Sequence, residues 1–306
     1  KLIPTEIESF RTLSYPHLEH MIRGFLRGTR EVEVAAFGVP GPVLNDRVDV
    51  TNVPWSLEAS RLARNLNLRS VQLLNDLVAT GYGIQALESH DLFTLNEGSP
   101  SEYQTQAMIA AGTGLGECVI HWESGKCSVL PCEAGHAAFS PHDSLQAELL
   151  QYLMRRSRYV CQERVISGPG LVSSYEFLRD AKNGSEQLHV AEEIREGDAA
   201  AVIAAHAQAE DDELCVLAMK LFLTAYGSEA GNLAVRTMAL GGIYLGGGIA
   251  PKIVRLLARG EFMRAFLEKE RMEELMAKIP VRVILDDRTG LRGAAYRAYV
   301  ANWGSD

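Results

Sequence analysis

The sequence predicts an α/β protein built as two lobes with a cleft between them. Helix and strand patterns alternate through about the first 90 residues, which is the order of a mixed α/β domain. A second run of strands, joined by glycine-rich turns, begins after about residue 87. Of the 306 residues, 47% are hydrophobic and 23% are charged, which is typical of a globular protein with enough apolar material for a large core.

Charge and composition exclude several classes of protein. The 30 Lys and Arg residues stand against 39 Asp and Glu residues, and no basic stretch offsets the net charge of −9, so we expect no nucleic-acid partner. The most apolar region, 237–250, is too short for a membrane span and contains five glycines. We do not expect the charged start to be a signal peptide, and five scattered cysteines suit reduced thiols. We therefore expect a cytoplasmic protein.

The elements of the first lobe follow from local patterns. Tyr15-Pro16 begins a helix, because proline suits a first helical turn and apolar residues recur at helical spacing after it. The next expected elements are a strand over 31–37, a second strand over 48–53, a helix capped by Ser56 that runs through Asn65, and a buried strand over 71–74.

The second lobe begins with three strands and continues with helices. The strands are expected over 108–111, 117–122 and 126–130. Helical patterns dominate 143–230, although 180–196 is polar enough to contain an exposed loop. The last expected elements are a buried strand over 243–245, a helix over 251–267, a strand over 281–285 and a helix over 290–300.

Asn75 and Asp76 stand where the buried strand of the first lobe ends and an apolar helix begins. Ligands of α/β proteins bind at the carboxyl ends of strands, so an amide and a carboxylate here can meet a polyhydroxyl substrate. The alternative is that Asp76 only caps the following helix, because aspartate is a favoured N-cap residue. The local sequence by itself favours the cap.

A glycine-rich run, Gly112-Thr113-Gly114-Leu115-Gly116, joins two predicted strands. Glycines let backbone N–H groups approach a phosphate, and the threonine adds a hydroxyl donor. The run is followed by a strand instead of the helix of a dinucleotide-binding motif, and it lacks the Lys-Ser/Thr ending of a P-loop. A simple hairpin turn remains the alternative.

Glu133 and His136 follow a predicted strand and can both form hydrogen bonds with one ligand. A surface pair without a ligand is the alternative. Six cysteine and histidine residues cluster between 118 and 142, but only Cys118 and His121 have the spacing of a zinc site. On a strand those two side chains point to opposite faces, so we expect no metal site.

Two further segments combine glycines with polar residues. In 163–171, Ser167 and Pro169 are typical of a helix start, and Glu163 is either a ligand of the site or a solvated carboxylate. The three glycines at 246–248 lie between a buried strand and a helix, and leave the backbone bare for a flat base or ribose. A close strand–helix crossing is the alternative there.

Taken together and in order, these segments resemble the bacterial glucokinase family of the hexokinase, actin and Hsp70 superfamily. The resemblance runs from about Tyr15 to the end of the chain. It is carried by Leu74-Asn75-Asp76, the run over 112–116, Leu130-Pro131 with the segment over 133–136, the segments over 163–171 and 247–251, and shorter matches over 51–55 and 290–293. It implies two actin-like, ribonuclease H-like lobes: a small domain over 1–86, completed by 287–306, and a large domain over 87–286.

The resemblance also implies the activity, which is phosphorylation of glucose to glucose 6-phosphate with ATP and Mg²⁺. Asp76 would be the general base on the 6-hydroxyl of the sugar. The other implied roles are sugar binding by Asn75, Glu133, His136 and Glu163, phosphate binding by Gly112, Thr113 and Gly114, and adenosine binding by Gly247 and Gly248. Phosphoryl transfer needs mainly positioning and charge neutralisation, which these residue types can supply.

Two departures from the family pattern affect this expectation. The family has Glu-Gly-Gly-His where this chain has Glu133-Ala134-Gly135-His136, which is a small change. The family also begins with a strand that carries an Asp-x-Gly-Gly-Thr phosphate loop, and no such segment precedes Tyr15. We expect the sequence given to be a fragment; the alternative is that one phosphate clamp and a metal-orienting carboxylate have been lost.

Several alternatives stay open at this point. The hexose could be mannose or an N-acetylhexosamine, the phosphoryl donor is not fixed, and a homodimer is one option for the oligomeric state. A sugar-binding protein without catalysis is a different class of function, which the missing loop would allow. A related group of kinases and repressors has a cysteine-rich zinc loop after Glu-x-Gly-His, but 137–142 contains no cysteine. We also find no helix-turn-helix extension, which argues against a sugar-sensing repressor.

Overall fold

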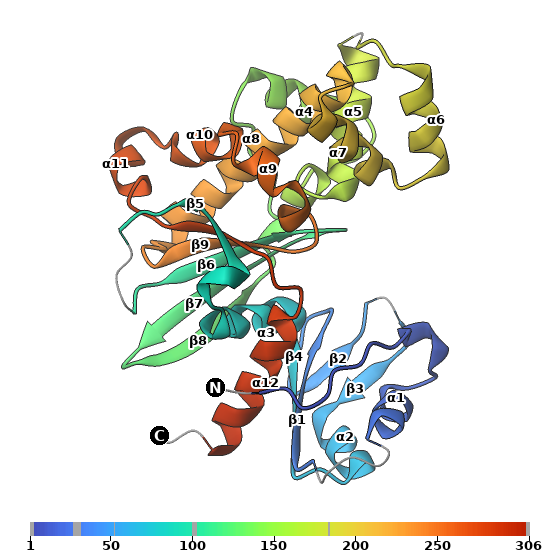
Figure 1. Ribbon diagram of the computed structural model, residues 1–306, viewed down its shortest axis with the longest axis vertical. Helices are drawn as coiled ribbons and strands as arrows, with labels where there is room; N and C mark the ends of the chain where they lie inside the picture. Colours follow the sequence, from blue (N-terminus) through green and yellow to red (C-terminus); the bar gives the residue numbers. More distant parts are fainter. Residues whose placement is uncertain (1–2, 27–31, 52, 100–102, 183, 304–306) are drawn as a thin grey trace. The chain divides into compact units, whose positions relative to one another are not determined.

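Two compact units make up the chain in the computed structural model, which describes residues 3–26, 32–51, 53–99, 103–182 and 184–303 (Figure 1). The first unit contains residues 1–88 and 286–306, and the second contains residues 89–285. Each unit has a hydrophobic core of its own.

A pair of parallel strands, β1 (Val34–Val39) and β4 (Ser70–Asn75), forms the centre of the first unit. Side chains on one face of the pair pack with the helices on that side, where Leu62 and Leu73 are buried. Figure 1 shows α1 (Leu18–Phe25) and α2 (Ala59–Leu66) on this face, and α3 (Asp76–Gly83) and α12 (Thr289–Trp303) on the other. Short 3-10 turns are η1 (Thr12–Ser14) and η2 (Ile84–Ala86).

The predicted helix cap at Ser56 is wrong. Ser56 lies in β3 (Ser56–Glu58), which pairs antiparallel with β2 (Arg47–Asp49), and α2 begins only at Ala59. The hairpin places Val48 opposite Leu57, and both side chains are buried in the core of the first unit. The strand pairing and the burial of these side chains outweigh the local preference of serine for a cap. The strand expected over 48–53 is shorter in the structure, where β2 ends at Asp49.

A six-stranded sheet with the order β5-β10-β9-β6-β7-β8 forms the centre of the second unit. The strands β10, β9 and β6 are parallel to one another, whereas β5, β7 and β8 run antiparallel to their neighbours. The strands are β5 (Leu92–Asn96), β6 (Gln106–Ala111), β7 (Leu115–Glu123), β8 (Lys126–Cys132), β9 (Gly242–Gly246) and β10 (Val281–Ile284). All but β5 were predicted.

Helices gather on one side of this sheet (Figure 1). The longest, α8 (Glu213–Thr237), has 25 residues and most of them are buried, so its apolar side chains form the middle of the core. The other helices are α4 (Ser144–Met154), α5 (Gly168–Ala181), α6 (Leu188–Glu196), α7 (Ala199–Ala209), α9 (Val254–Leu257), α10 (Glu261–Leu267) and α11 (Glu273–Met276). The 3-10 turns are η3 (Ser89–Asp91), η4 (Ala134–His136), η5 (Gln162–Arg164), η6 (Ala250–Ile253) and η7 (Glu270–Met272).

One expectation for the helices of the second unit needs correction. The helix expected over 251–267 is broken, because Gly260 adopts a φ of +108° between α9 and α10. The polar segment 180–196 contains a loop, as expected, over 184–187, before α6 begins at Leu188. Within the described residues, no helix combines the length and apolarity that a membrane crossing requires.

Candidate functional site

The junction of β4 and α3 carries the two polar residues that were predicted for the first unit. Asn75 is the N-cap of α3: its Oδ1 accepts hydrogen bonds from the backbone N–H groups of Leu77, at 3.0 Å, and Val78, at 3.3 Å. Its Nδ2 donates to the carbonyl of Gly41 at 3.2 Å. An amide nitrogen has two hydrogens, so one donor of Asn75 remains for a ligand.

Asp76 is the first residue of α3 and is half-buried. Its Oδ1 accepts from the N–H of Leu77 at 3.0 Å, and the positive end of the helix stabilises its negative charge. The N-cap position itself belongs to Asn75, so capping by Asp76 does not explain this residue. The geometry fixes a carboxylate at the carboxyl end of a strand.

In the second unit, the glycine run links β6 to β7 as an antiparallel hairpin, in which Ala111 pairs with Leu115. The run was predicted as either a phosphate loop or a simple hairpin, and its backbone is indeed that of a hairpin. The hairpin is also bonded to the start of α5, where the N–H of Gly168 donates to the carbonyl of Gly112 at 2.9 Å. Thr113, at the tip of the hairpin, is exposed.

The glycines after β9 lie beside this hairpin. β6 and β9 are parallel neighbours, so their carboxyl ends meet at one edge of the sheet. Gly247 has a φ of +80°, and a Cβ there would overlap the carbonyl oxygen of Ala111. This close contact is with the end of a neighbouring strand and is not the strand–helix crossing that was the alternative. Gly247 and Gly248 are both exposed, so bare backbone lies at the surface here.

Glu163 on η5 is tied to the glycine run. Its Oε2 accepts a hydrogen bond from the N–H of Leu115 at 3.0 Å. A Cβ on Gly114 would overlap the same oxygen, so only glycine allows this approach. Glu163 is therefore not the freely solvated carboxylate that was its alternative.

Glu133 and His136 flank a 3-10 turn in which the N–H of His136 donates to the carbonyl of Glu133 at 3.0 Å. Both residues are exposed. Gly135 between them is buried, and a Cβ there would overlap the carbonyl oxygen of Leu115. The turn therefore lies against the start of β7, on the strand that follows the glycine run.

A hollow of about 580 Å³ in the second unit brings three of the predicted residues together, namely Thr113, His136 and Glu163. Arg164, Ser167 and Pro169 also line it; they lie in the segment 163–171 singled out above, but no role in a site was assigned to them. The sequence analysis missed the remaining lining residues, which are Ser157, Arg158, Tyr159, Cys161 and Ser173. The lining does not include Glu133, Gly247 or Gly248, and Asn75 and Asp76 belong to the first unit.

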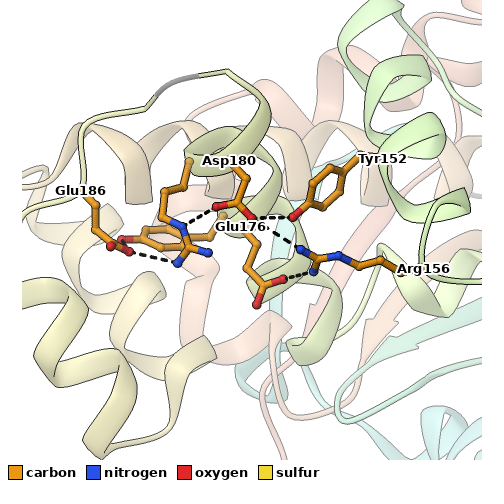
Figure 2. Close-up of polar contacts among 7 residues, drawn as sticks. Tyr152, Arg156, Glu176, Asp180 and Glu186 are labelled. Carbon is orange, nitrogen blue, oxygen red and sulfur yellow. Dashed lines mark hydrogen bonds and ion pairs between the residues drawn. The ribbon is translucent and has the colours of Figure 1, made fainter.

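Polar contacts join the end of α4 to α5 (Figure 2), and Arg156 in this group directly precedes Ser157, which lines the hollow. Arg156, after α4, pairs with Glu176 at 2.7 Å, and the hydroxyl of Tyr152 donates to Asp180 at 2.8 Å. Hydrogen bonds from Arg179 and Tyr152 lower the pKa of Asp180, so this carboxylate stays charged. The segment after α4 is thereby held against α5.

Two glutamates are buried beneath the hollow. Glu229 on α8 accepts hydrogen bonds from Gln162, at 2.8 Å, from Asn232, at 3.0 Å, and from Arg236. Glu117 on β7 is 1% exposed, and its carboxylate oxygens have no hydrogen-bond partner among the described residues. Burial, and then the charge of Glu229, raise the pKa of Glu117 to about 8. The sequence analysis did not predict this cluster; the signal that could have indicated it is Glu229, a carboxylate within the apolar run of α8.

Replacing Glu117 with glutamine is expected to stabilise the protein by roughly 1–3 kcal/mol at about pH 8. The pKa of Glu117 is raised from 4.5 to about 8 on folding, so the stability it contributes is complete below pH 4.5 and is lost as the pH rises through 8. Glutamine has nearly the same shape and does not titrate. The thermal unfolding temperature should therefore fall less between about pH 6 and 8.5 for Glu117→Gln than for the wild type.

Glu123→Gln is the matched control, because Glu123 has the same side chain and ends the same strand but is exposed. Its pH profile should follow the wild type. If Glu117→Gln also follows the wild-type profile, Glu117 does not lose a proton in this range.

Among the described residues, no group of three or more His, Cys, Asp and Glu side chains could hold a metal ion. Mg²⁺ is usually bound through one or two carboxylates together with substrate phosphates, so such a group is not required for it. In a reaction with ATP, Mg²⁺ would enter as part of the substrate.

Comparisons with sequences of known proteins cover nearly the whole chain. The family described as Glucokinase matches residues 2–301. The chain is 40% identical over 304 residues to the glucokinase of Nostoc sp. (strain PCC 7120 / SAG 25.82 / UTEX 2576), which covers 94% of this chain and 89% of that protein. It is 31% identical over 291 residues to the glucokinase of Shigella sonnei (strain Ss046), covering 95% and 88%.

Solved structures have the same fold. A glucokinase from an Antarctic psychrotroph aligns with a TM-score of 0.83 and 27% identity, over 95% of this chain and 88% of that one. A ROK family glucokinase from Streptomyces griseus, solved with glucose and AMPPNP, aligns with a TM-score of 0.60 and 20% identity, over 92% and 87%. The second likeness concerns the fold alone.

Proposed function

Because the chain belongs to the glucokinase family, we propose how its residues carry out the phosphorylation of glucose by ATP. The fold is the actin-like α/β fold of these sugar kinases, and the enzyme is an ATP-dependent hexose kinase. The roles of individual residues are the proposal.

Asp76 is proposed as the general base. The oxygen of the glucose 6-hydroxyl attacks the γ-phosphorus of ATP, its proton passes to the Asp76 carboxylate, and ADP leaves. The proposal is supported by the fixed position of Asp76 at the start of α3, where the cap is supplied by Asn75. A positioned base of this kind contributes roughly two to four orders of magnitude in rate.

Four residues are proposed to hold the remaining hydroxyls of the sugar: Asn75, Glu133, His136 and Glu163. Carboxylates accept from hydroxyls, and amide and imidazole groups can donate to them. The support for Glu163 is strongest, since the hydrogen bond from Leu115 orients its carboxylate at the rim of the hollow. Water must be kept from the phosphate, because it would compete with the sugar as acceptor.

The glycine run is proposed to bind the phosphates of MgATP through Gly112, Thr113 and Gly114, with the adenosine lying on Gly247 and Gly248. Backbone N–H groups near a glycine-rich turn can approach phosphate oxygens, and Thr113 adds an exposed hydroxyl. When bound, Mg²⁺ neutralises phosphate charge.

The observation that carries the proposed function is the hydrogen bond that joins Glu163 to the glycine run, because the proposed sugar ligand then lies beside the proposed phosphate loop. The test is a coupled assay for glucose 6-phosphate with glucose and MgATP, repeated with mannose and N-acetylhexosamines. Product from glucose at the highest kcat/KM is expected. Glucose binding without any product would instead identify a non-catalytic sugar-binding protein.

We also propose that the enzyme is cytoplasmic and functions without zinc. The segment 137–142 after His136 contains no cysteine, so a structural zinc loop has no thiolates to build it. Elemental analysis of the purified protein should find zinc far below one ion per chain. Stoichiometric zinc, with activity lost on its removal and restored by zinc, would contradict this prediction. A homodimer stays a prediction, which light scattering would test.

A further inference from the structure

Gln162 directly precedes the proposed sugar ligand Glu163 and is only 4% exposed. Its side-chain Nε2 donates a hydrogen bond to Oε2 of Glu229 at 2.8 Å, and both groups are buried. The bond spans 67 positions of sequence, from the η5 turn to the middle of α8. A hydrogen bond to a charged, buried acceptor belongs to the stronger class of such bonds.

Glu229 is a rigid anchor for this bond. It lies on the longest helix of the second unit, is 2% exposed and also accepts from Asn232 and Arg236. Arg236 forms an ion pair with Glu229 and supplies the positive charge that a buried carboxylate requires. The Gln162 amide therefore meets a fixed, charged acceptor.

The backbone around Gln162 connects the two turns that carry the proposed sugar ligands. The N–H of Gln162 donates to the carbonyl of Ala137 at 2.9 Å, and Ala138 forms an antiparallel bridge with Cys161. Ala137 follows His136 directly, and Glu163 follows Gln162. Anything that fixes Gln162 therefore fixes both η4 and η5.

We propose that Gln162 is a positioning residue for sugar binding, whose amide, held by Glu229, keeps the turns of Glu133, His136 and Glu163 in register. This inference rests on the proposed function. Gln162 does not touch the sugar in this proposal; it acts through its neighbours. Ligand groups must be held within a fraction of an ångström, so losing the anchor should weaken ground-state binding more than the chemical step.

Gln162→Met tests the proposal, because methionine keeps the length of the side chain but cannot donate a hydrogen bond. We expect KM for glucose to rise about tenfold while kcat changes by less than about threefold. The dissociation constant for glucose, measured by calorimetry, should rise with KM. A residue that only stabilises the fold would lower the unfolding temperature and leave both values unchanged.

Asn232→Leu is the matched control. Asn232 donates to the same Oε2 of Glu229 at 3.0 Å, but it lies on α8 and is not attached to either turn. We expect this variant to lose stability as Gln162→Met does, with KM within about twofold of the wild type. Equal increases in KM for the two variants, or no increase for Gln162→Met, would overturn the proposal.

Gln162→Glu keeps the test decisive if Gln162→Met does not fold. A protonated carboxyl group at 162 can donate to Glu229, whereas an ionised one cannot and would face the carboxylate of Glu229, with Arg236 as the nearby cation. The ratio of its KM to that of the wild type should increase as the pH rises from about 6 towards 8.5. A ratio near one over this whole range overturns the proposal.

Measurements on the wild type distinguish a failure of this proposal from a failure of the proposed function on which it rests. If the wild type binds glucose but forms no product, the kinase assignment fails, and the dissociation constants of the variants still decide the role of Gln162. If the wild type neither binds nor phosphorylates glucose, both fail.

Discussion

Asp76→Asn is expected to lower kcat by roughly two to four orders of magnitude, while glucose binding stays close to that of the wild type. Asparagine is nearly isosteric, and its amide oxygen can still accept from the N–H of Leu77, so the start of α3 should be preserved. It cannot accept the proton of the 6-hydroxyl. A coupled assay measures kcat, and calorimetry measures glucose affinity; the loss should appear in kcat and in kcat/KM alike.

Asp198→Asn is a suitable control, because Asp198 is also a carboxylate at a helix start: it caps α7 through the N–H of Ala201. Its turnover should equal that of the wild type. Wild-type turnover in Asp76→Asn would show that Asp76 serves only the start of α3.

Gly293→Ala is expected to destabilise the first unit by at least about 3 kcal/mol. Gly293 on α12 faces α3 so closely that a Cβ would overlap the carbonyl oxygen of Ala79 and the backbone nitrogen of Gly83. The approach is reciprocal, since a Cβ on Gly83 would overlap the carbonyl of Thr289. Backbone cannot move aside as a flexible side chain can, so the two helices must separate.

Urea unfolding should show a lower midpoint for Gly293→Ala, and a separate early transition if the first unit unfolds alone. Gly290→Ala is the control from the same helix: its Cβ would meet only the hydroxyl of Thr80, at 3.1 Å. We expect its stability to change much less. Unchanged stability in Gly293→Ala would mean that α3 and α12 can separate without cost.

The strand ends and turns of the site could be predicted because local signals define them. The apolar residues before Asn75 predicted β4, and Ser167 with Pro169 predicted the start of α5, where the Ser167 hydroxyl accepts from the N–H of Gly170. Which of two adjacent polar residues caps α3 was not predictable. Both types are good caps, and the choice depends on where the chain turns.

Features that depend on pairing with another segment were missed. Ser56 lies in a strand because Leu57 pairs with Val48, and β5 exists because β10 offers it an edge. The bond between Gln162 and Glu229 joins residues with no shared local pattern. Pairings of this kind depend on the whole fold, and local propensity is a weak guide to them.

The helix that packs on α3 has a consequence for synthesis of the protein. α12 follows the whole of residues 89–285 in the chain, so α3 and the Asp76 it carries emerge from the ribosome long before their partner. At roughly 5–20 residues per second, the delay is of the order of ten to forty seconds. The sheet of the second unit is also completed late, because β10 lies between β5 and β9 and is made just before α12. Until translation reaches α12, the face of α3 that it covers stays open to chaperones and proteases.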